Sequence, residues 1–143
     1  MGFRKLNHGQ GFTLIELVII IVILGILAAV AIPRYANISD EAREASARAA
    51  LGGLRSGIAI WYANQAVQTG TADWPDQDSL ATVGTVMEHA IPKNPFQPDS
   101  NAPDSIVTGV TKGVTVGTRG GWAYNEGTGE LWPNTSEVGE NNW

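Results

Sequence analysis

An apolar stretch occupies residues 12–32 and is interrupted at only three positions. These are Thr13, Glu16 and Gly25. At about 1.5 Å per residue, a helix of this length spans ~30 Å, which matches the hydrocarbon core of a bilayer. A lone carboxylate in lipid costs on the order of 2.5–3.5 kcal/mol, so Glu16 is expected to have a partner there. The pattern predicts a membrane-spanning helix with one functional acid near its start.

Beyond Pro33, apolar residues recur at spacings of three and four, which is typical of an amphipathic helix. The predicted buried side comprises Ile38, Ala42, Ala45, Ala49, Leu51, Leu54, Ile58, Trp61 and Tyr62. The predicted solvent side comprises Arg34, Asp40, Glu41, Arg43, Glu44, Arg48 and Arg55. We therefore predict one long helix over residues 13–67. Pro33 should kink it because proline removes a backbone donor, and Gly25 is a second weak point.

The C-terminal part should contain a short helix and a small sheet. Asp76 or Asp78 is the expected N-cap of a helix that runs to residue 91 and stops at Pro92. Strands are predicted at three places, residues 110–116, 122–124 and 130–132, with a tight turn at 126–129. They should form an antiparallel meander that packs on the long helix, with its core supplied by Trp122, Tyr124 and Trp132. The predicted fold class is α+β. The tail from residue 135 shows no pattern, and the sequence leaves two alternatives open, a mobile tail or one docked through Trp143.

The sequence Gly11-Phe12-Thr13-Leu14-Ile15-Glu16 resembles the processing motif of type IV pilins and of type II secretion pseudopilins. The resemblance extends to the apolar run, Gly25 and Pro33. It implies a membrane peptidase that cleaves after Gly11 and methylates the new amine of Phe12. It also implies a type IV pilin-like chain with a cleaved leader (1–11), a transmembrane and assembly half of the helix (12–33), an amphipathic half (34–68) and a globular part (69–143).

Cleavage would leave the Phe12 amine as a cation in lipid. The Glu16 carboxylate of a neighbouring copy can neutralise it, and each charge is costly alone. Phe12 and Glu16 are therefore the predicted assembly residues. The resemblance implies self-association into a helical homopolymer, with a prepilin peptidase and an inner-membrane assembly platform as partners.

The distribution of charge predicts the orientation in the membrane. Arg4 and Lys5 precede the apolar run, and the positive-inside bias keeps that end in the cytoplasm. The leader holds no acid, so the remaining chain has seven bases against 14 acids and direct nucleic acid binding is not expected. An ordinary signal peptide cleaved after Ala29-Val30-Ala31 is the alternative for the run, but Glu16 and the length of the run argue against it.

Few residues offer catalytic chemistry. The chain has no cysteine, and His89 is the only imidazole outside the leader, so neither a nucleophilic triad nor a zinc site is expected and the protein is not predicted to be an enzyme. Many type IV pilins close a C-terminal loop with a disulfide, so another device must hold this end here. Asp99, Asn101 and Asp104 form a loose oxygen-rich cluster and are the calcium candidates, although a solvated loop is the ordinary interpretation. No other cofactor is predicted.

Three functions fit these observations. The first is a filament subunit, kept in the bacterial inner membrane with its C-terminal part outside the cytoplasm and then exported to a pilus (fimbrium). The sequence does not distinguish between adhesion, motility and DNA uptake as the role of such a fibre. The alternative is a pseudopilin that forms a periplasmic pseudopilus for protein secretion. The third is a singly anchored binding domain, against which the processing motif argues.

Overall fold

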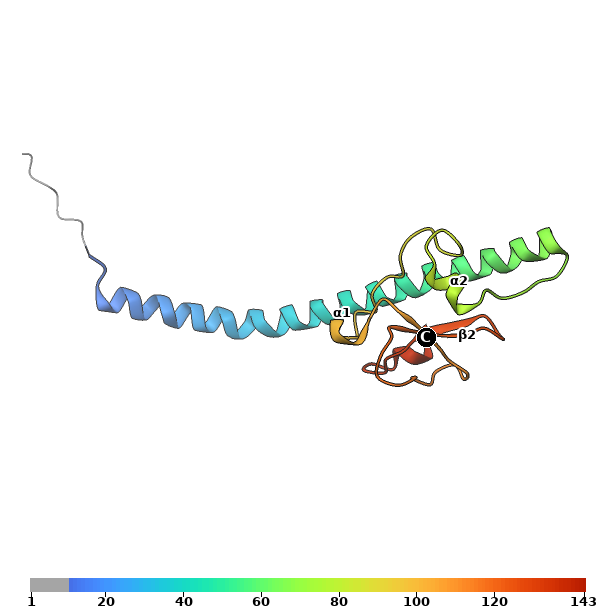
Figure 1. Ribbon diagram of the computed structural model, residues 1–143. Coiled ribbons are helices and arrows are strands. Elements are labelled where there is room, and N and C mark those ends of the chain that lie inside the picture. The colour runs from blue at the N-terminus through green and yellow to red at the C-terminus, as the bar shows by residue number, and fades with distance from the viewer. Residues whose placement is uncertain (1–10) are drawn as a thin grey trace, which may run out of the picture. The chain divides into compact units, whose positions relative to one another are not determined.

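The computed structural model of the protein describes residues 11–143, and Figure 1 shows their path. The chain divides into a first unit that ends at Asp40 and a second unit, Glu41–Trp143. A long helix, α1 (Leu14–Thr69), begins in the first unit and ends in the second. The helix predicted over residues 13–67 is therefore confirmed.

In the first unit, every described residue is exposed. The helix continues without a break through Gly25 and Pro33. Among the described residues, α1 is the one helix that is long and apolar enough to cross a membrane, judged by length and composition alone. The stretch predicted to span a bilayer is thus helical from Leu14 onward, and it is apolar apart from Thr13, Glu16 and Gly25.

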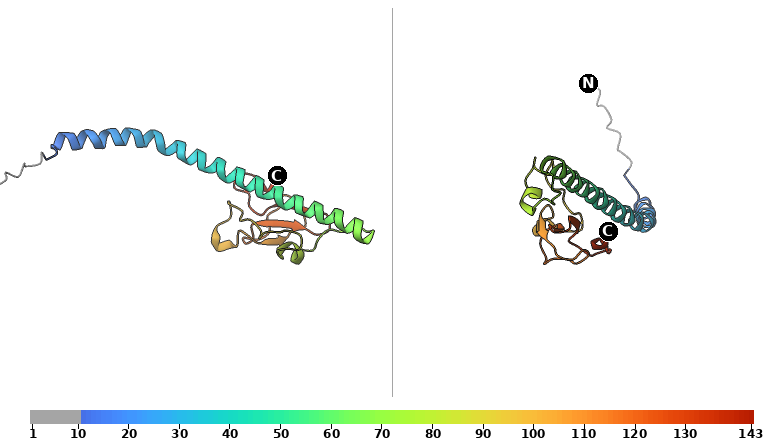
Figure 2. Two further views of the ribbon diagram at one scale, coloured as in Figure 1. Left: turned by 90° about the horizontal axis from the view of Figure 1, so that it is seen from above. Right: turned by 90° about the vertical axis from the view of Figure 1, so that its right-hand side faces the viewer.

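The second unit combines the last part of α1 with small elements. These are α2 (Gln77–Ala81), the strands β1 (Ile106–Thr108), β2 (Trp122–Asn125) and β3 (Glu130–Pro133), and the 3-10 turns η1 (Asp99–Asn101) and η2 (Glu140–Asn142). Figure 2 shows the sheet beside this part of α1. The α+β class is therefore confirmed.

The sheet is mixed, so the prediction of a wholly antiparallel meander is wrong. β2 and β3 form an antiparallel hairpin with Trp122 opposite Pro133, and both strands lie where they were predicted. β1, which the sequence analysis did not find, runs parallel to β2 with Ile106 beside Trp122. Parallel strands need a long crossover rather than a hairpin, and residues 109–121 supply it.

Residues 110–116, predicted as a strand, form part of this crossover loop. Gly113 and Gly117 adopt φ values of 83° and 60°, which lie outside the β region. The buried Asn134 amide accepts a hydrogen bond from the Val116 N–H and donates one to the Val116 carbonyl, at 2.6 and 3.0 Å. The loop's backbone groups are thus satisfied by a side chain in place of a strand ladder.

The helix predicted to run to residue 91 ends much earlier. Asp76 is its N-cap, as predicted, and accepts a hydrogen bond from the Ser79 N–H at 2.6 Å. α2 then stops at Ala81, and Gly84 turns the chain with a φ of 86°. The prediction was wrong because the β-branched Thr82 and Val83, followed by a glycine, favour leaving the helix.

The core of the second unit lies between α1 and the sheet. Its buried members are Leu51, Leu54, Ile58, Leu80, Ile106, Trp122, Tyr124 and Leu131. The three aromatic residues expected to supply the core are all fully buried, so this prediction is confirmed. Their polar atoms are paired as well, because Trp122 Nε1 donates to the Pro92 carbonyl and the Tyr124 hydroxyl donates to the Pro75 carbonyl, each at 2.8 Å.

The buried side of α1 differs in part from the predicted one. The predicted members Ile38, Ala42, Ala45 and Ala49 are exposed, and Ala47 is buried instead. Arg43 and Arg55, assigned to the solvent side, are half-buried, and Arg43 donates to the Pro95 carbonyl at 3.1–3.2 Å. Alanines carry little hydrophobic signal and occur on several sides of this segment, so their spacing did not identify the packed side.

Arg48 and Arg55 hold the end of the chain. The Arg55 guanidinium donates to the carbonyls of Leu131 and Trp143, at 2.8–3.0 Å and 2.5 Å. The Arg48 guanidinium carbon lies 3.7 Å from the centre of the Trp143 ring, within cation–π range. We call Arg48, Arg55 and Trp143 the C-terminal clasp. It ties the tail to α1 without a disulfide, so the tail, for which the sequence left mobility and docking both open, is docked through Trp143.

The buried side chain of Glu140 fixes the backbone of the same tail through hydrogen bonds. Its side chain is fully buried, and its carboxylate accepts hydrogen bonds from the N–H groups of Glu137 and Val138 at 3.1 and 2.8 Å. Burial alone raises the pKa of Glu140, but hydrogen bonds from the Thr135 side chain and the main chain outweigh it and hold the pKa below the ordinary 4.5. The charged form of this buried acid is therefore the stable one.

Candidate functional site

The predicted cleavage point lies just before α1. Gly11, Phe12 and Thr13 precede the helix, and the Phe12 side chain is 82% exposed. A Cβ atom added at Gly11 would meet no other atom within 4 Å. Within residues 11–143, no atom therefore gives a steric reason for glycine at this position.

Thr13 and Glu16 form a reciprocal pair at the start of α1. Glu16 Oε2 accepts hydrogen bonds from the Thr13 N–H at 2.8 Å and from the Thr13 hydroxyl at 2.7 Å. Thr13 Oγ1 in turn accepts from the Glu16 N–H at 3.3 Å. This arrangement is a capping box, which satisfies free N–H groups and places a carboxylate at the positive end of the helix dipole.

A carboxylate placed in lipid would need hydrogen-bond partners, and the capping box supplies Glu16 with two of them. Both hydrogen bonds reach Oε2, and Oε1 receives none within residues 11–143. The pairing of Glu16 with Phe12 of another copy stays a prediction. The sequence analysis missed the cap, although the Thr-x-x-Glu spacing is its signature, because it treated both residues only as interruptions of an apolar run.

Gly25 and Pro33 both lie inside α1. A Cβ atom added at Gly25 would have open space around it, so no neighbouring atom of the described chain explains the glycine. Their role as weak points of the helix stays a prediction.

The three calcium candidates lie in and after η1. Asp99 Oδ1 accepts a hydrogen bond from Lys93 Nζ at 2.8 Å, and the Asn101 carbonyl accepts one from the Gly120 N–H at 2.8 Å. The Asp104 side chain is exposed. From residue 11 onward, no group of three or more His, Cys, Asp or Glu side chains could hold a metal ion. Calcium binding therefore stays a prediction, and the ion pair with Lys93 competes with it.

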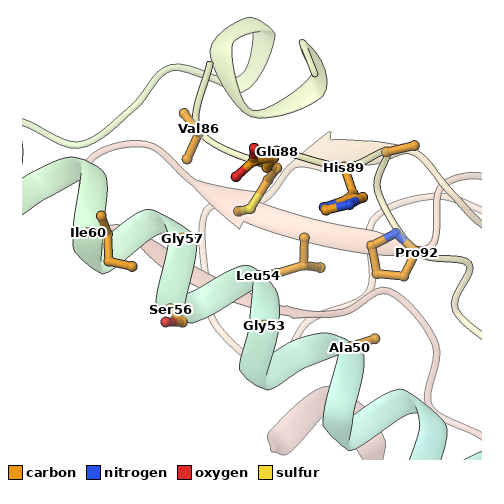
Figure 3. Close-up of a pocket in the computed structure, with 12 residues that line it drawn as sticks. Ala50, Gly53, Leu54, Ser56, Gly57, Ile60, Val86, Glu88, His89 and Pro92 are labelled. Atoms are coloured by element: carbon orange, nitrogen blue, oxygen red, sulfur yellow. The ribbon is translucent and has the colours of Figure 1, made fainter. Parts of the chain in front are cut away.

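A groove of about 520 Å³ lies in the second unit between α1 and the loop that follows α2. Figure 3 shows Gly53 and Gly57 along the helix side, facing the loop that carries Glu88 and His89. His89 is exposed there, as predicted for a surface residue, although it does not end a helix. The lining is mostly apolar, which suits binding better than catalysis.

Comparison with known proteins identifies the N-terminal segment. Residues 6–32 match the family described as the prokaryotic N-terminal methylation motif. The chain is 51% identical over 53 residues to the type IV narrow pilus major component PilA5 of Thermus thermophilus, covering 37% of this chain and 46% of that protein. It is 39% identical over 79 residues to a fimbrial protein of Neisseria meningitidis, covering 55% of this chain and 43% of that one.

A longer alignment joins the chain to the fimbrial protein EcpC of Eikenella corrodens. The identity is 29% over 121 residues, covering 83% of this chain and 74% of that protein. The chain spans less than half the length of the first two relatives. No solved structure matches it. All three relatives are named as pilus or fimbrial proteins and none as an enzyme, in agreement with the prediction that this chain is not an enzyme.

Proposed function

We propose that the chain is a type IV pilin and a structural subunit of a type IV pilus-like filament, supported by the methylation motif at residues 6–32 and by its similarity to pilus and fimbrial proteins. The first unit stores the chain in the inner membrane and later joins it to other copies in a helical homopolymer. The exposed apolar surface of α1 carries this proposal, because every described residue of the first unit is exposed and most are large and apolar. Such a surface has to be covered by lipid or by further copies.

Processing comes first in this proposal. A prepilin peptidase hydrolyses the bond between the Gly11 carbonyl carbon and the Phe12 nitrogen, and the freed amine is then methylated. Support comes from the methylation motif over residues 6–32, from the exposure of Phe12 and from the absence of a steric role for Gly11 in the fold. The leader is thereby separated from the part of the chain that assembles.

The capping box supports a direct role for Glu16 in assembly. Thr13 holds Oε2, so the carboxylate stays beside the first turn of α1, and Oε1 remains available to the Phe12 amine of another copy. In a hydrocarbon environment, two separate charges cost far more than a hydrogen-bonded pair. Addition of a subunit is therefore most favourable at the axial offset that brings the two charges together.

Intact-protein mass spectrometry on filaments sheared from the cell surface, alongside the membrane fraction, tests the proposal. The expected mass in the sheared filaments is that of residues 12–143 plus one methyl group. A chain that starts after Ala31 would overturn both the cleavage site and the filament role, because residues 12–31 would have been discarded.

The same measurement separates the pilus from its alternative. The processed mass confined to membranes, with none in the sheared fraction, would reject an extended pilus and favour a pseudopilus or another short assembly on the inner-membrane platform. The names of the relatives favour the pilus.

A further inference from the structure

The groove of the second unit has a floor suited to close approach by a helix. Gly53 and Gly57 stand four residues apart on α1. A Cβ atom added at Gly53 would have no neighbour within 4 Å, whereas Met87 of the facing loop already lies against Gly57, with its sulfur 2.5 Å from the position of an added Cβ atom. The open position at Gly53 lets another backbone come close to α1, and Met87 over Gly57 borders that position with an apolar side chain. Ile60 of α1 and Val86 of the facing loop flank the floor, and 59% of the Ile60 side chain is exposed (Figure 3). An apolar surface therefore lies open beside a smooth stretch of helix.

The loop side of the groove carries one acid. Glu88 lines the groove, is exposed, and forms no hydrogen bond or ion pair with any described residue. The remaining polar side chains of the lining are Ser56 and His89, and no lysine or arginine is among them. An occupant that combines an apolar helix face with one cation would complement this lining.

The chain itself contains such a segment, where α1 leaves its apolar run. Within residues 30–38, Val30 and Ile38 lie four residues before and after Arg34 on the same side of α1, with Tyr35 next to it, and each of the three is more than half exposed. Arg34 lies among them, and it is exposed and has no partner within residues 11–143. The more N-terminal part of α1, from residue 14 to residue 29, offers apolar surface but no basic residue.

We propose that the groove receives residues 30–38 of a second copy, with Arg34 of that copy paired to Glu88. This inference rests on the proposed filament role and names a contact through which the copies recognise each other. The apolar side chains supply affinity by leaving water, and the ion pair fixes which part of the incoming helix docks. A free apolar ligand would fill the floor and leave Glu88 unpaired, and it is tested below as the competing occupant.

Charge exchange in the full chain tests the pairing. Glu88→Arg alone and Arg34→Glu alone should each lower the yield of sheared filaments at least about tenfold, since like charges facing across an interface cost several kcal/mol. The double exchange should restore most of the yield. Asp78→Arg, which makes the same charge change at another exposed position of the second unit, should assemble as the unaltered chain does. The membrane level of processed protein reports whether each variant is made and inserted.

The outcomes separate the two proposals. An unaltered chain that gives no filaments would defeat the filament role itself. Normal filaments from both single exchanges, or a double exchange that stays as poor as the singles, would overturn only the groove pairing. Improved assembly after truncation of the groove floor, as in Ile60→Ser, would indicate a competing apolar ligand and would likewise overturn it.

Cross-linking gives an independent readout, and the absence of cysteine makes the background zero. Two variants, Arg34→Cys and Glu88→Cys, are produced in the same cells and mildly oxidised, and their masses identify the mixed dimer. That dimer should be abundant in filaments. Ala36→Cys, two residues further along and so on the opposite side of α1, is the matched control for Arg34→Cys. Equal yields of mixed dimer from both positions, or none from Arg34→Cys, would contradict the docking.

Discussion

In the second unit, α1 buries Leu51, Leu54 and Ile58 against a sheet, whereas in the first unit the same helix leaves every described side chain exposed. One continuous helix thus serves two environments. The second unit is completed by contacts within the chain, and the first is completed only by lipid or by further copies. Changes in the first unit should therefore alter processing and assembly, whereas changes in the core and tail of the second unit, away from its groove, should alter unfolding, and the predictions below test that separation.

The largest expected effect follows from Gly11→Ala. We expect the leader to remain attached, because the resemblance implies that the peptidase needs a glycine before the cut. Intact mass spectrometry of the membrane fraction should show the full chain without methylation. Gly52→Ala, the same change at an open position of α1, should be processed normally. A shortened, methylated Gly11→Ala product would refute the assigned site.

Glu16→Ala should be processed and inserted in the membrane but should lower the filament yield at least about tenfold, since it removes the partner that we propose for the Phe12 amine of another copy. Glu16→Gln sharpens the test, because an amide can keep the bond to the Thr13 N–H while the charge is lost. Poor assembly of both variants would assign the defect to the charge. Normal filaments from Glu16→Gln would assign it to the cap, and the charge-pairing argument would then fail.

The helix of the first unit was predicted well from the sequence because the local pattern of apolar residues is enough to identify it. The apolar run and the motif at residues 11–16 depend on local composition, so the position of the helix and the resemblance to pilins followed from them. The capping box shows the limit even here, since Thr13 and Glu16 form a local pair that was visible in the spacing but was not recognised.

The second unit was harder because its organisation rests on contacts between distant residues. The valines near residue 114 alternate like a strand, yet Asn134, eighteen residues beyond Val116, holds that loop in place. Arg55 looked like a surface charge because its acceptors, the Leu131 and Trp143 carbonyls, lie 76 and 88 residues further along the chain. Helix-forming tendency and hydrophobic spacing contain no information about such partners.

Gly121→Ala should produce the largest loss of stability in the second unit. A Cβ atom at this position would lie 1.8 Å from the Pro103 carbonyl oxygen, so the backbone has to move. We expect a loss of more than about 3 kcal/mol in the free energy of unfolding and a Tm lower by more than about 10 °C in the detergent-solubilised chain. Gly52→Ala should leave Tm unchanged or raise it slightly. A Gly121→Ala chain as stable as its parent would contradict the tight packing described here.

Arg55→Met should have a smaller effect, about 1–3 kcal/mol, because it leaves the Leu131 and Trp143 carbonyls without their donor while it keeps much of the side-chain packing. Chemical denaturation of the solubilised chain measures it. Arg34→Met is the matched control, since Arg34 has no partner in the described chain and should change stability by less than about 0.5 kcal/mol. Equal losses of stability from the two substitutions would show that the hydrogen bonds of Arg55 in the C-terminal clasp do not stabilise the fold.

The smallest effect concerns the dependence of stability on pH. Hydrogen bonds hold the pKa of Glu140 in the folded chain below its ordinary value of 4.5, so the unfolded chain takes up the proton first as the pH falls. The stabilisation is therefore fully present above about pH 4.5 and is lost as the pH falls through the lower, folded pKa.

Glu140→Gln keeps the shape of the side chain but removes this titration. We expect the variant to be about 1–2 kcal/mol less stable than the unaltered chain at pH 7, and the difference to shrink as the pH approaches 3. The other carboxylates are common to both chains, so their titration cancels in the comparison. Filament yield at neutral pH should change little, because Glu140 belongs to the self-contained unit. A stability difference that stays constant from pH 7 to pH 3 would show that the charge of Glu140 is not what orders the tail.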